Sequence, residues 1–189
     1  MPICATISSG FVLSCTTPLI PGTEDDILLA NKSDISGYTV DATNPMLVTG
    51  IALKVGKQFF KFEGQNMSVE PKSRLVLTRY SRLYEHEARF KIFANDPAAK
   101  LQVDKIIKGE VVALIKSKSG AWELFGKDIG LKVTEMERDP NNTDTGGAYD
   151  LLLKTPDTAA KETFLPSTFF SVDAAGTETA ITALLAPAA

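Results

Sequence analysis

The segment from Ser119 to Gly130, SGAWELFGKDIG, combines glycines and a lysine in a way that invites comparison with a phosphate-binding loop. A Walker A loop has the form G-x-x-x-x-G-K-[ST], because its length arranges backbone amides around the phosphate and its hydroxyl binds magnesium. Here five residues separate Gly120 from Gly126, and Lys127 is followed by Asp128. The intervening AWELF is apolar, as a strand would be. We therefore expect turn glycines at both ends of a short strand, with the two charges exposed.

The polar loop at residues 139–147 holds two further candidate sites. The triplet DTG, which starts at Asp144, matches the active-site triplet of aspartic peptidases, but there the Asp ends an apolar strand and here it follows DPNNT. Oxygen ligands spaced loosely like a calcium loop come from Asp139, Asn141, Thr143 and Asp144, without the Gly and Glu that such a loop needs. A solvated turn is the simpler prediction, and an ion site is the alternative.

The single histidine and the two cysteines form no recognisable catalytic or metal-binding pattern. His86 lies on the apolar side of an alternating segment, so we expect a buried, hydrogen-bonded core or interface histidine. Cys4 and Cys15 with one histidine do not make a zinc set, and free thiols are expected unless an oxidising compartment pairs them. We therefore expect no enzyme activity, no cofactor and no metal.

Composition is that of an ordinary globular protein. The chain has 189 residues and a formal net charge of −3, which disfavours nucleic-acid binding as the main function because phosphate contacts need clustered Lys and Arg. No apolar run reaches the roughly 20 residues of a membrane-spanning helix. No Lys or Arg precedes Lys32, so the basic region of a signal peptide is missing. We expect neither secretion nor membrane insertion.

Hydrophobic periodicity predicts an α+β fold that is mainly β, an antiparallel β-sandwich or partial barrel flanked by one helix. Residues 1–24 are expected to form an irregular N-terminal arm, and residues 25–172 the β-sandwich domain. Residues 173–189 are an Ala- and Thr-rich tail, either mobile or a short docking helix.

Turn and cap residues place the individual elements. A hairpin is expected over residues 48–64, turning at Gly56-Lys57, and a polar excursion from the sheet at about 63–74. The helix is expected at about residues 97–108, because Asp96 can cap it, proline follows and glycine ends it. Further strands are expected in EVVALIKS, AWELFG, GLKVTEME and AYDLLLK.

The cleanest alternation is in YEHEARFKIFA, residues 84–94. One face is mostly apolar, and the other carries the charged side chains of Glu85, Glu87, Arg89 and Lys91. This is typical of a half-buried antiparallel strand, and its charged side is expected to face solvent, a neighbouring subunit or a lumen.

The order of these elements resembles that of tail tube proteins of long-tailed bacteriophages. The resemblance covers roughly residues 26–172. It rests on GKQFFKFEG, the polar excursion, YEHEARFKIFA, the helix after NDP, the run GEVVALIKSKSGAWELFGKDIGL, and the late GGAYDLLLKTPD with LPSTFF.

The resemblance implies a structural virion protein that assembles in the host cytoplasm. Six copies would close into a ring, and rings would stack into a hollow tube that phage DNA crosses without specific binding. Its partners would be itself and other tail proteins; a tail terminator or another tail-completion protein is a related possibility. The excursion would contact a neighbouring ring through Gln65, Asn66, Met67, Ser68, Glu70 and Lys72. The lumen or a neighbouring subunit would be faced by Glu85, Glu87, Arg89 and Lys91.

Two functions of other classes stay open. A β-sandwich binding module for carbohydrate or a cell surface would use exposed aromatic rings, with Tyr80, Tyr84 and Trp122 as candidates, although Trp122 is otherwise expected in the core. A nucleotide-dependent enzyme would use Lys127, against which the loop spacing argues.

Overall fold

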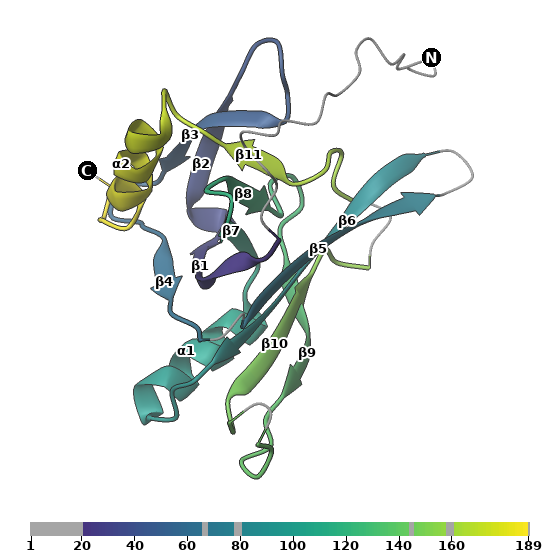
Figure 1. Cartoon of the computed structure of the whole chain (residues 1–189), viewed down its shortest axis with the longest axis vertical. Coiled ribbons are helices and arrows are strands. Elements are labelled where there is room, and N and C mark those ends of the chain that lie inside the picture. The colour runs from purple at the N-terminus through teal and green to yellow at the C-terminus, as the bar shows by residue number, and fades with distance from the viewer. Residues whose placement is uncertain (1–20, 66–67, 78–80, 144–145, 158–160, 189) are drawn as a thin grey trace.

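The computed structural model of the chain describes residues 21–65, 68–77, 81–143, 146–157 and 161–188 (Figure 1). Cys4, Cys15 and most of the expected N-terminal arm lie outside these residues. The described chain forms two β-sheets and two helices, which confirms the expected α+β, mainly β class.

The larger sheet has seven strands in the order β2-β3-β11-β8-β7-β1-β4. Its strands are β1 (Thr23–Asn31), β2 (Ile35–Val40), β3 (Leu47–Leu53), β4 (Phe60–Phe62), β7 (Val111–Ser117), β8 (Trp122–Phe125) and β11 (Ser167–Phe169). A single 3₁₀ turn, Lys32–Asp34, joins β1 to β2. The middle strands β1 and β7 carry continuous apolar runs, because both of their faces are covered.

The smaller sheet has four antiparallel strands in the order β5-β6-β10-β9. These are β5 (Val69–Leu77), β6 (Arg82–Ile92), β9 (Lys132–Glu137) and β10 (Tyr149–Lys154). The sheet lies across one face of the larger sheet, and one end of the long β5–β6 hairpin projects beyond the body of the molecule (Figure 1).

Two hydrophobic cores flank the larger sheet. The first lies between the two sheets and under the helix α1 (Pro97–Lys108), where Ile27, Phe90, Val103, Ala113 and Leu151 are buried together. The second lies on the opposite face, under the helix α2 (Ala174–Leu184), where Leu28, Leu114, Leu124, Ile181 and Leu184 are buried. Alternate residues of the same strands therefore serve different cores.

Both helices begin as their capping residues predict. In α1, the Asp96 carboxylate accepts a hydrogen bond from the Ala99 amide at 3.0 Å, Pro97 occupies the first turn and Gly109 follows the last residue. In α2, the Asp173 carboxylate accepts from the Gly176 amide. The expected helix at 97–108 is confirmed, and for the C-terminal segment the docking helix is the alternative that the structure shows.

The expected hairpin at residues 48–64 is wrong. Strand β3 pairs with β2 and β11, whereas β4 pairs with β1, so the two strands never meet. Gly56 does turn the chain, with φ of +73°. The strands separate because the connection bonds to the C-terminal segment instead: the Gly56 and Phe59 amides donate to the carbonyls of Ala188 and Leu184, each at 2.8 Å.

The expected excursion at residues 63–74 is also wrong over its second half. Residues from Val69 onward form the edge strand β5, which pairs with β6 along its whole length. The polar composition that suggested a loop arises because β5 has one exposed face and little cover over the other.

Candidate subunit interface

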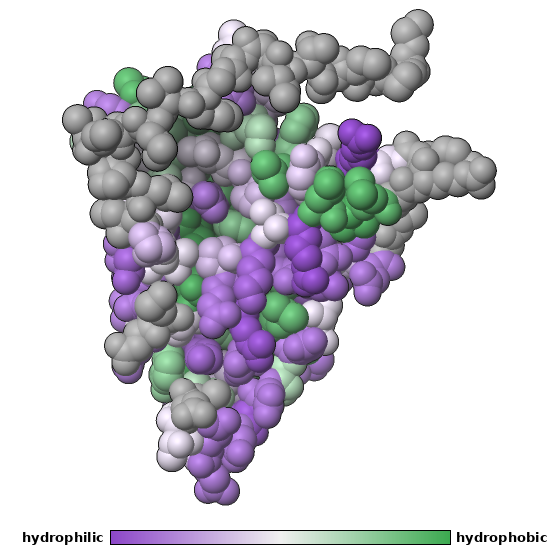
Figure 2. Space-filling model, turned by 45° about the vertical axis from the view of Figure 1, so that its right-hand side comes forward, coloured by the Kyte–Doolittle hydropathy of each residue, from purple (hydrophilic) through white to green (hydrophobic). Residues whose placement is uncertain are grey.

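The outward surface of the smaller sheet carries the densest set of charges in the described chain. We call it the charged face: Glu70, Lys72 and Arg74 from β5, Glu85, Glu87, Arg89 and Lys91 from β6, Glu135 and Glu137 from β9, and Asp150 and Lys154 from β10. Strand alternation puts these residues on one side and the core residues on the other. Hydrophilic side chains run as a band down the molecule in Figure 2.

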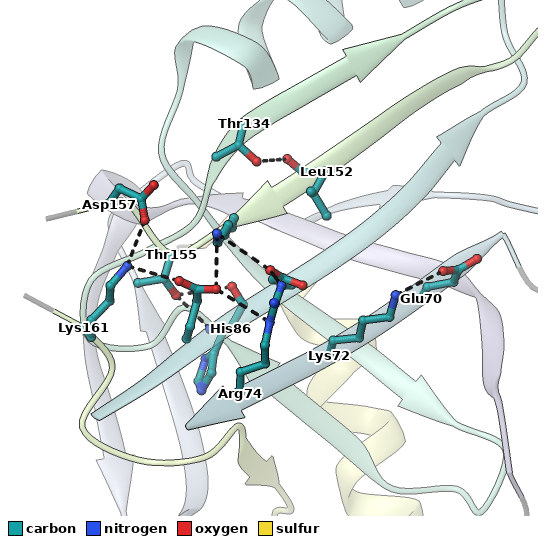
Figure 3. Close-up of polar contacts among 12 residues, drawn as sticks. Glu70, Lys72, Arg74, His86, Thr134, Leu152, Thr155, Asp157 and Lys161 are labelled. Atoms are coloured by element: carbon teal, nitrogen blue, oxygen red, sulfur yellow. Dashed lines mark hydrogen bonds and ion pairs between the residues drawn. The ribbon is translucent and has the colours of Figure 1, made fainter. Parts of the chain in front are cut away.

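Two acidic side chains at the centre of the charged face are buried by their partners. Glu85 accepts from Lys154 and Lys161 at 3.3 Å each, and Glu87 is ion-paired with Arg74 (Figure 3). Solvent exposure, one of the surroundings expected for this side of β6, is therefore wrong for the two glutamates, while a neighbouring subunit or a lumen stays a prediction. Basic side chains from β5, β10 and the segment after β10 cover them, since a buried carboxylate needs compensating charge.

The remaining two residues predicted on this face are half-buried. The Arg89 guanidinium donates to Asp150 at 2.8 Å, and this contact raises the pKa of Arg89. A hollow of about 340 Å³ lies between the β5 and β9 sides, lined by residues of both signs that include Arg74, Arg89 and Glu135. Opposite charges alternate across it, so the hollow has no strong preference for a small anion or cation.

The two edges of the smaller sheet differ in charge. On the outward side, the β5 edge carries Glu70, Lys72 and Arg74, and the β9 edge carries Glu135 and Glu137. No further described strand pairs with β5 or with β9. Each edge therefore presents unpaired backbone groups, with a net positive row on β5 and two carboxylates on β9.

The structure does not bring the predicted inter-ring residues together in one loop. Gln65 is exposed, and its amide donates to the buried Ser68 hydroxyl at 3.0 Å. Glu70 and Lys72 lie in β5, with 3.8 Å between their charged groups. Asn66 and Met67 lie outside the described residues. What projects from the body is the other end of β5, near Leu77 (Figure 1).

The glycine-rich segment does form an anion cradle, but the protein fills it with its own carboxylate. Gly126 and Gly130 adopt φ of +74° and +87°, which residues other than glycine rarely reach. The amides of Asp128 and Ile129 each donate to the buried Glu162 carboxylate at 2.9 Å. The sequence suggested the turn; it gave no signal for Glu162, which lies 33 residues beyond its nearer partner.

Burial shifts the pKa values of two charged side chains at this turn, Glu162 and Lys32. It raises the pKa of Glu162, and the two amides only partly oppose that shift. The ammonium of Lys32 donates to the Lys127 carbonyl, and burial lowers the pKa of Lys32 against the attraction of Glu162 and Asp128. Lys127 itself faces outward over the Phe164 ring at 5.5 Å. The segment is a structural junction built around the buried Glu162 carboxylate.

His86 is buried and hydrogen-bonded on both ring nitrogens, as its position predicted. Nδ1 accepts from the Gly126 amide at 3.2 Å, so Nε2 carries the proton and donates to the Phe164 carbonyl at 3.0 Å. The ring packs edge-on against Phe125. Burial lowers the pKa of His86 to about 4, so the imidazole is neutral at pH 7.

The aromatic candidates for ligand stacking are not gathered on one surface. Trp122 is only 7% exposed, and its indole N–H donates to Glu178 on α2 at 3.0 Å, which confirms its expected place in the core. Tyr84 is half-buried beside the extended segment that contains Glu162. Tyr80 lies outside the described residues.

Within the described residues, no group of three or more His, Cys, Asp or Glu side chains is placed to hold a metal ion, and Asp144 of the polar loop is not among them. None of the helices found there is long and apolar enough to cross a bilayer. Comparison of the chain with protein-family models, curated proteins and solved structures found no match.

Proposed function

We propose that the protein is a structural subunit that closes head-to-tail into rings, and that stacked rings form a hollow tube of the phage-tail type. The observation that carries the proposal is the smaller sheet: four strands, two unpaired edges, and a charged outer surface. Such a sheet is incomplete by itself, because open edges attract further strands.

The geometry of the edges fits a cyclic arrangement. With four antiparallel strands, β5 and β9 run in opposite directions, so placing β9 of one copy beside β5 of the next continues the same antiparallel pattern. With a stagger of about two residues along the junction, as the shear of a closed barrel supplies, Lys72 would then meet Glu135. Repeating one heterologous contact around an axis closes a ring and leaves no free edge.

In such a ring the charged face would line one surface of a continuous barrel. Glu85 and Glu87 are already neutralised by Arg74, Lys154 and Lys161, and charges of both signs are interspersed around them. A wall of this kind has no continuous row of basic side chains that could bind the DNA phosphates. It suits a conduit through which a polyanion passes without being held, as in a tail tube.

Charge reversal at the edges tests the ring. Lys72→Glu and Glu135→Lys should each prevent ring formation, because like charges would face each other across the junction, and the double variant should restore it. Both side chains are exposed, so the fold should survive. Lys100→Glu on α1 is the matched control and should assemble like the wild type.

The readout is sedimentation velocity with electron microscopy of concentrated protein. Rings or tubes in the wild type, lost in the single variants and regained in the double variant, would support the proposal. Wild-type protein that stays monomeric at every concentration, or single variants that assemble normally, would contradict it.

A further inference from the structure

Glu123 of β8 is a carboxylate on the side of the larger sheet that carries the first core. Trp122 and Leu124 belong to the second core, so strand alternation turns Glu123 and Phe125 to the opposite side, and Phe125 is buried in the first core. On the neighbouring strand β7, Glu123 pairs with Ile115, which is also buried there. An acidic side chain therefore occupies a position at which its neighbours are apolar and buried.

The Glu123 carboxylate has no partner in the described part of the chain. It is half-buried, and no described residue forms a hydrogen bond or an ion pair with it. Burial raises the pKa of Glu123, and no nearby positive charge opposes that shift. A carboxylate that leaves water without a partner is costly, and such groups are frequent at binding sites.

Two hollows meet at Glu123. The larger one measures about 590 Å³ and lies between β5 and the turn that joins β7 to β8. The smaller one measures about 290 Å³ and lies between β5 and the segments that precede β3 and β11. Glu123 and Pro71 line both hollows, so these two residues flank the place where the hollows join. We call the two hollows together the Glu123 trough.

The trough is open because β5 turns away from the larger sheet. The β5–β6 hairpin diverges from β8 and β11 toward its projecting end (Figure 1). Val69 of β5 is still buried in the first core, whereas Pro71 is half-buried and Ser73 is exposed. The inner side of β5 thus loses its cover beside Glu123.

Most polar groups of the trough are already bonded within the chain. In the larger hollow, the Thr23 hydroxyl donates to the Val69 carbonyl, and the hydroxyls of Ser117 and Ser119 are bonded to each other, both at 2.7 Å. In the smaller hollow, Lys72 has its ammonium 3.8 Å from the Glu70 carboxylate. The group that still needs a partner is the Glu123 carboxylate.

The chemistry of the trough favours an organic cation over other small ligands. A metal ion needs several protein ligands, and no described group of three or more His, Cys, Asp or Glu side chains is placed to hold one. An anion would be repelled by Glu123 and by Glu70, which also lines the larger hollow. An ammonium group supplies both the N–H donors and the positive charge that Glu123 lacks.

The larger hollow has room for the rest of such a molecule. Its volume falls within the range of small-molecule pockets, about 300–1,000 Å³. Val69, Pro71 and Ala121 give it apolar wall on the β5 and β8 sides. An apolar body placed there would bury this surface while its ammonium stays beside Glu123.

We propose that the Glu123 trough binds an organic ammonium ion with an apolar body, with the ammonium beside Glu123 and the body in the larger hollow. This inference goes beyond the proposed ring. The ring contact uses the outward side and the backbone edge of β5, whereas the trough lies on the inner side of the same strand.

Calorimetric titration of the full-length protein tests the site, with 2-phenylethylammonium as the probe. The dissociation constant should be on the order of 1 mM, as expected for a ligand of this size. The neutral analogue 2-phenylethanol has nearly the same shape and should bind roughly tenfold more weakly, because it lacks the charge. The ammonium should also raise the midpoint of thermal denaturation, since it binds only the folded protein.

Three variants locate the ligand. Glu123→Gln should lower the affinity for the ammonium roughly tenfold. Because the carboxylate has no partner, this variant should be at least as stable as the wild type without the probe. Glu137→Gln makes the same change at an exposed position on β9 and should bind like the wild type. Ala121→Phe should weaken binding with Glu123 intact, because the ring fills the larger hollow.

Each outcome decides for or against the site. Equal affinity for the ammonium and the alcohol would overturn the assigned role of charge. Equal affinity in Glu123→Gln and Glu137→Gln would show that the cation binds elsewhere and would overturn the proposal. A wild type that gives no heat of binding up to about 20 mM probe would overturn it as well.

Discussion

At the scale of single residues, Glu162 and His86 explain why a phosphate-loop-like segment has no room for a phosphate. Glu162 occupies the amides of Asp128 and Ile129, and His86 occupies the amide of Gly126. The two residues tie the turn between β8 of the larger sheet and β9 of the smaller sheet to strand β6, since Glu162 also exchanges backbone hydrogen bonds with Tyr84. This junction holds the two sheets in one fixed relation.

His86 should make the stability of the protein fall in mild acid. Its pKa is about 4 in the folded state and about 6.5 in the unfolded chain, so only the unfolded state takes up a proton between these values. The contribution of His86 is complete above pH 6.5 and is lost as pH falls toward 4. From pH 7 to pH 5 the free energy of unfolding should drop by about 2 kcal/mol from this residue.

The measurement is urea denaturation of the wild type and of His86→Gln at both pH values. The variant should lose about 2 kcal/mol less than the wild type over this interval. Glu162 acts in the opposite direction, because its raised pKa favours the folded state as it protonates, but it is common to both proteins. Equal slopes in the two proteins would show that His86 is protonated equally in both states.

At the scale of elements, α2 covers one face of the larger sheet. Its buried residues Ile181 and Leu184 cover the second core, and Glu178 anchors it to Trp122 and to Lys116, the latter at 2.8 Å. The carbonyls at its end also bind the connection between β3 and β4. The C-terminal segment thus decides where β4 goes.

Weakening the packing of α2 against the second core should therefore destabilise the larger sheet. Ile181→Ala should lower the free energy of unfolding by about 2–4 kcal/mol, because it leaves a cavity in the second core. Thr182→Ala, on the exposed side of the same helix, should change it by less than about 0.5 kcal/mol. Thermal or urea denaturation distinguishes the two; similar values for both variants would mean that α2 packs only loosely.

At the scale of the whole molecule, the ring contact proposed between the β5 and β9 edges combines backbone hydrogen bonds with pairs of exposed charges. Assembly should therefore weaken with salt, since exposed charges are screened within about 10 Å at 0.1 M and about 3 Å at 1 M. Sedimentation in 0.05 M and 1 M NaCl should show fewer closed rings at the higher concentration. The Lys72→Glu/Glu135→Lys double variant should respond similarly, and rings that strengthen with salt would point to a mainly apolar contact.

Local sequence signals identified the elements whose hydrogen bonds are local or whose alternation is regular. The Asp96, Pro97 and Gly109 signals gave α1 to the residue, and the alternation in β6 separated its core side from its charged side. The sequence predicted that Trp122 and His86 lie in the core, because the apolar side of a strand packs against the core. These features depend only on neighbours along the chain.

The sequence by itself determined the fold class, the helix, most strands and the absence of a standard Walker loop. The tertiary structure alone decided which strands pair, because β3 pairs with β2 and the distant β11, and β4 pairs with β1, rather than with each other. It also decided that Glu85 and Glu87 are buried and that Glu162 fills the glycine loop, since their partners come from β5, β10 and segments distant in sequence. Spacing along one strand shows where a charge points, and only the packed chain shows what covers it.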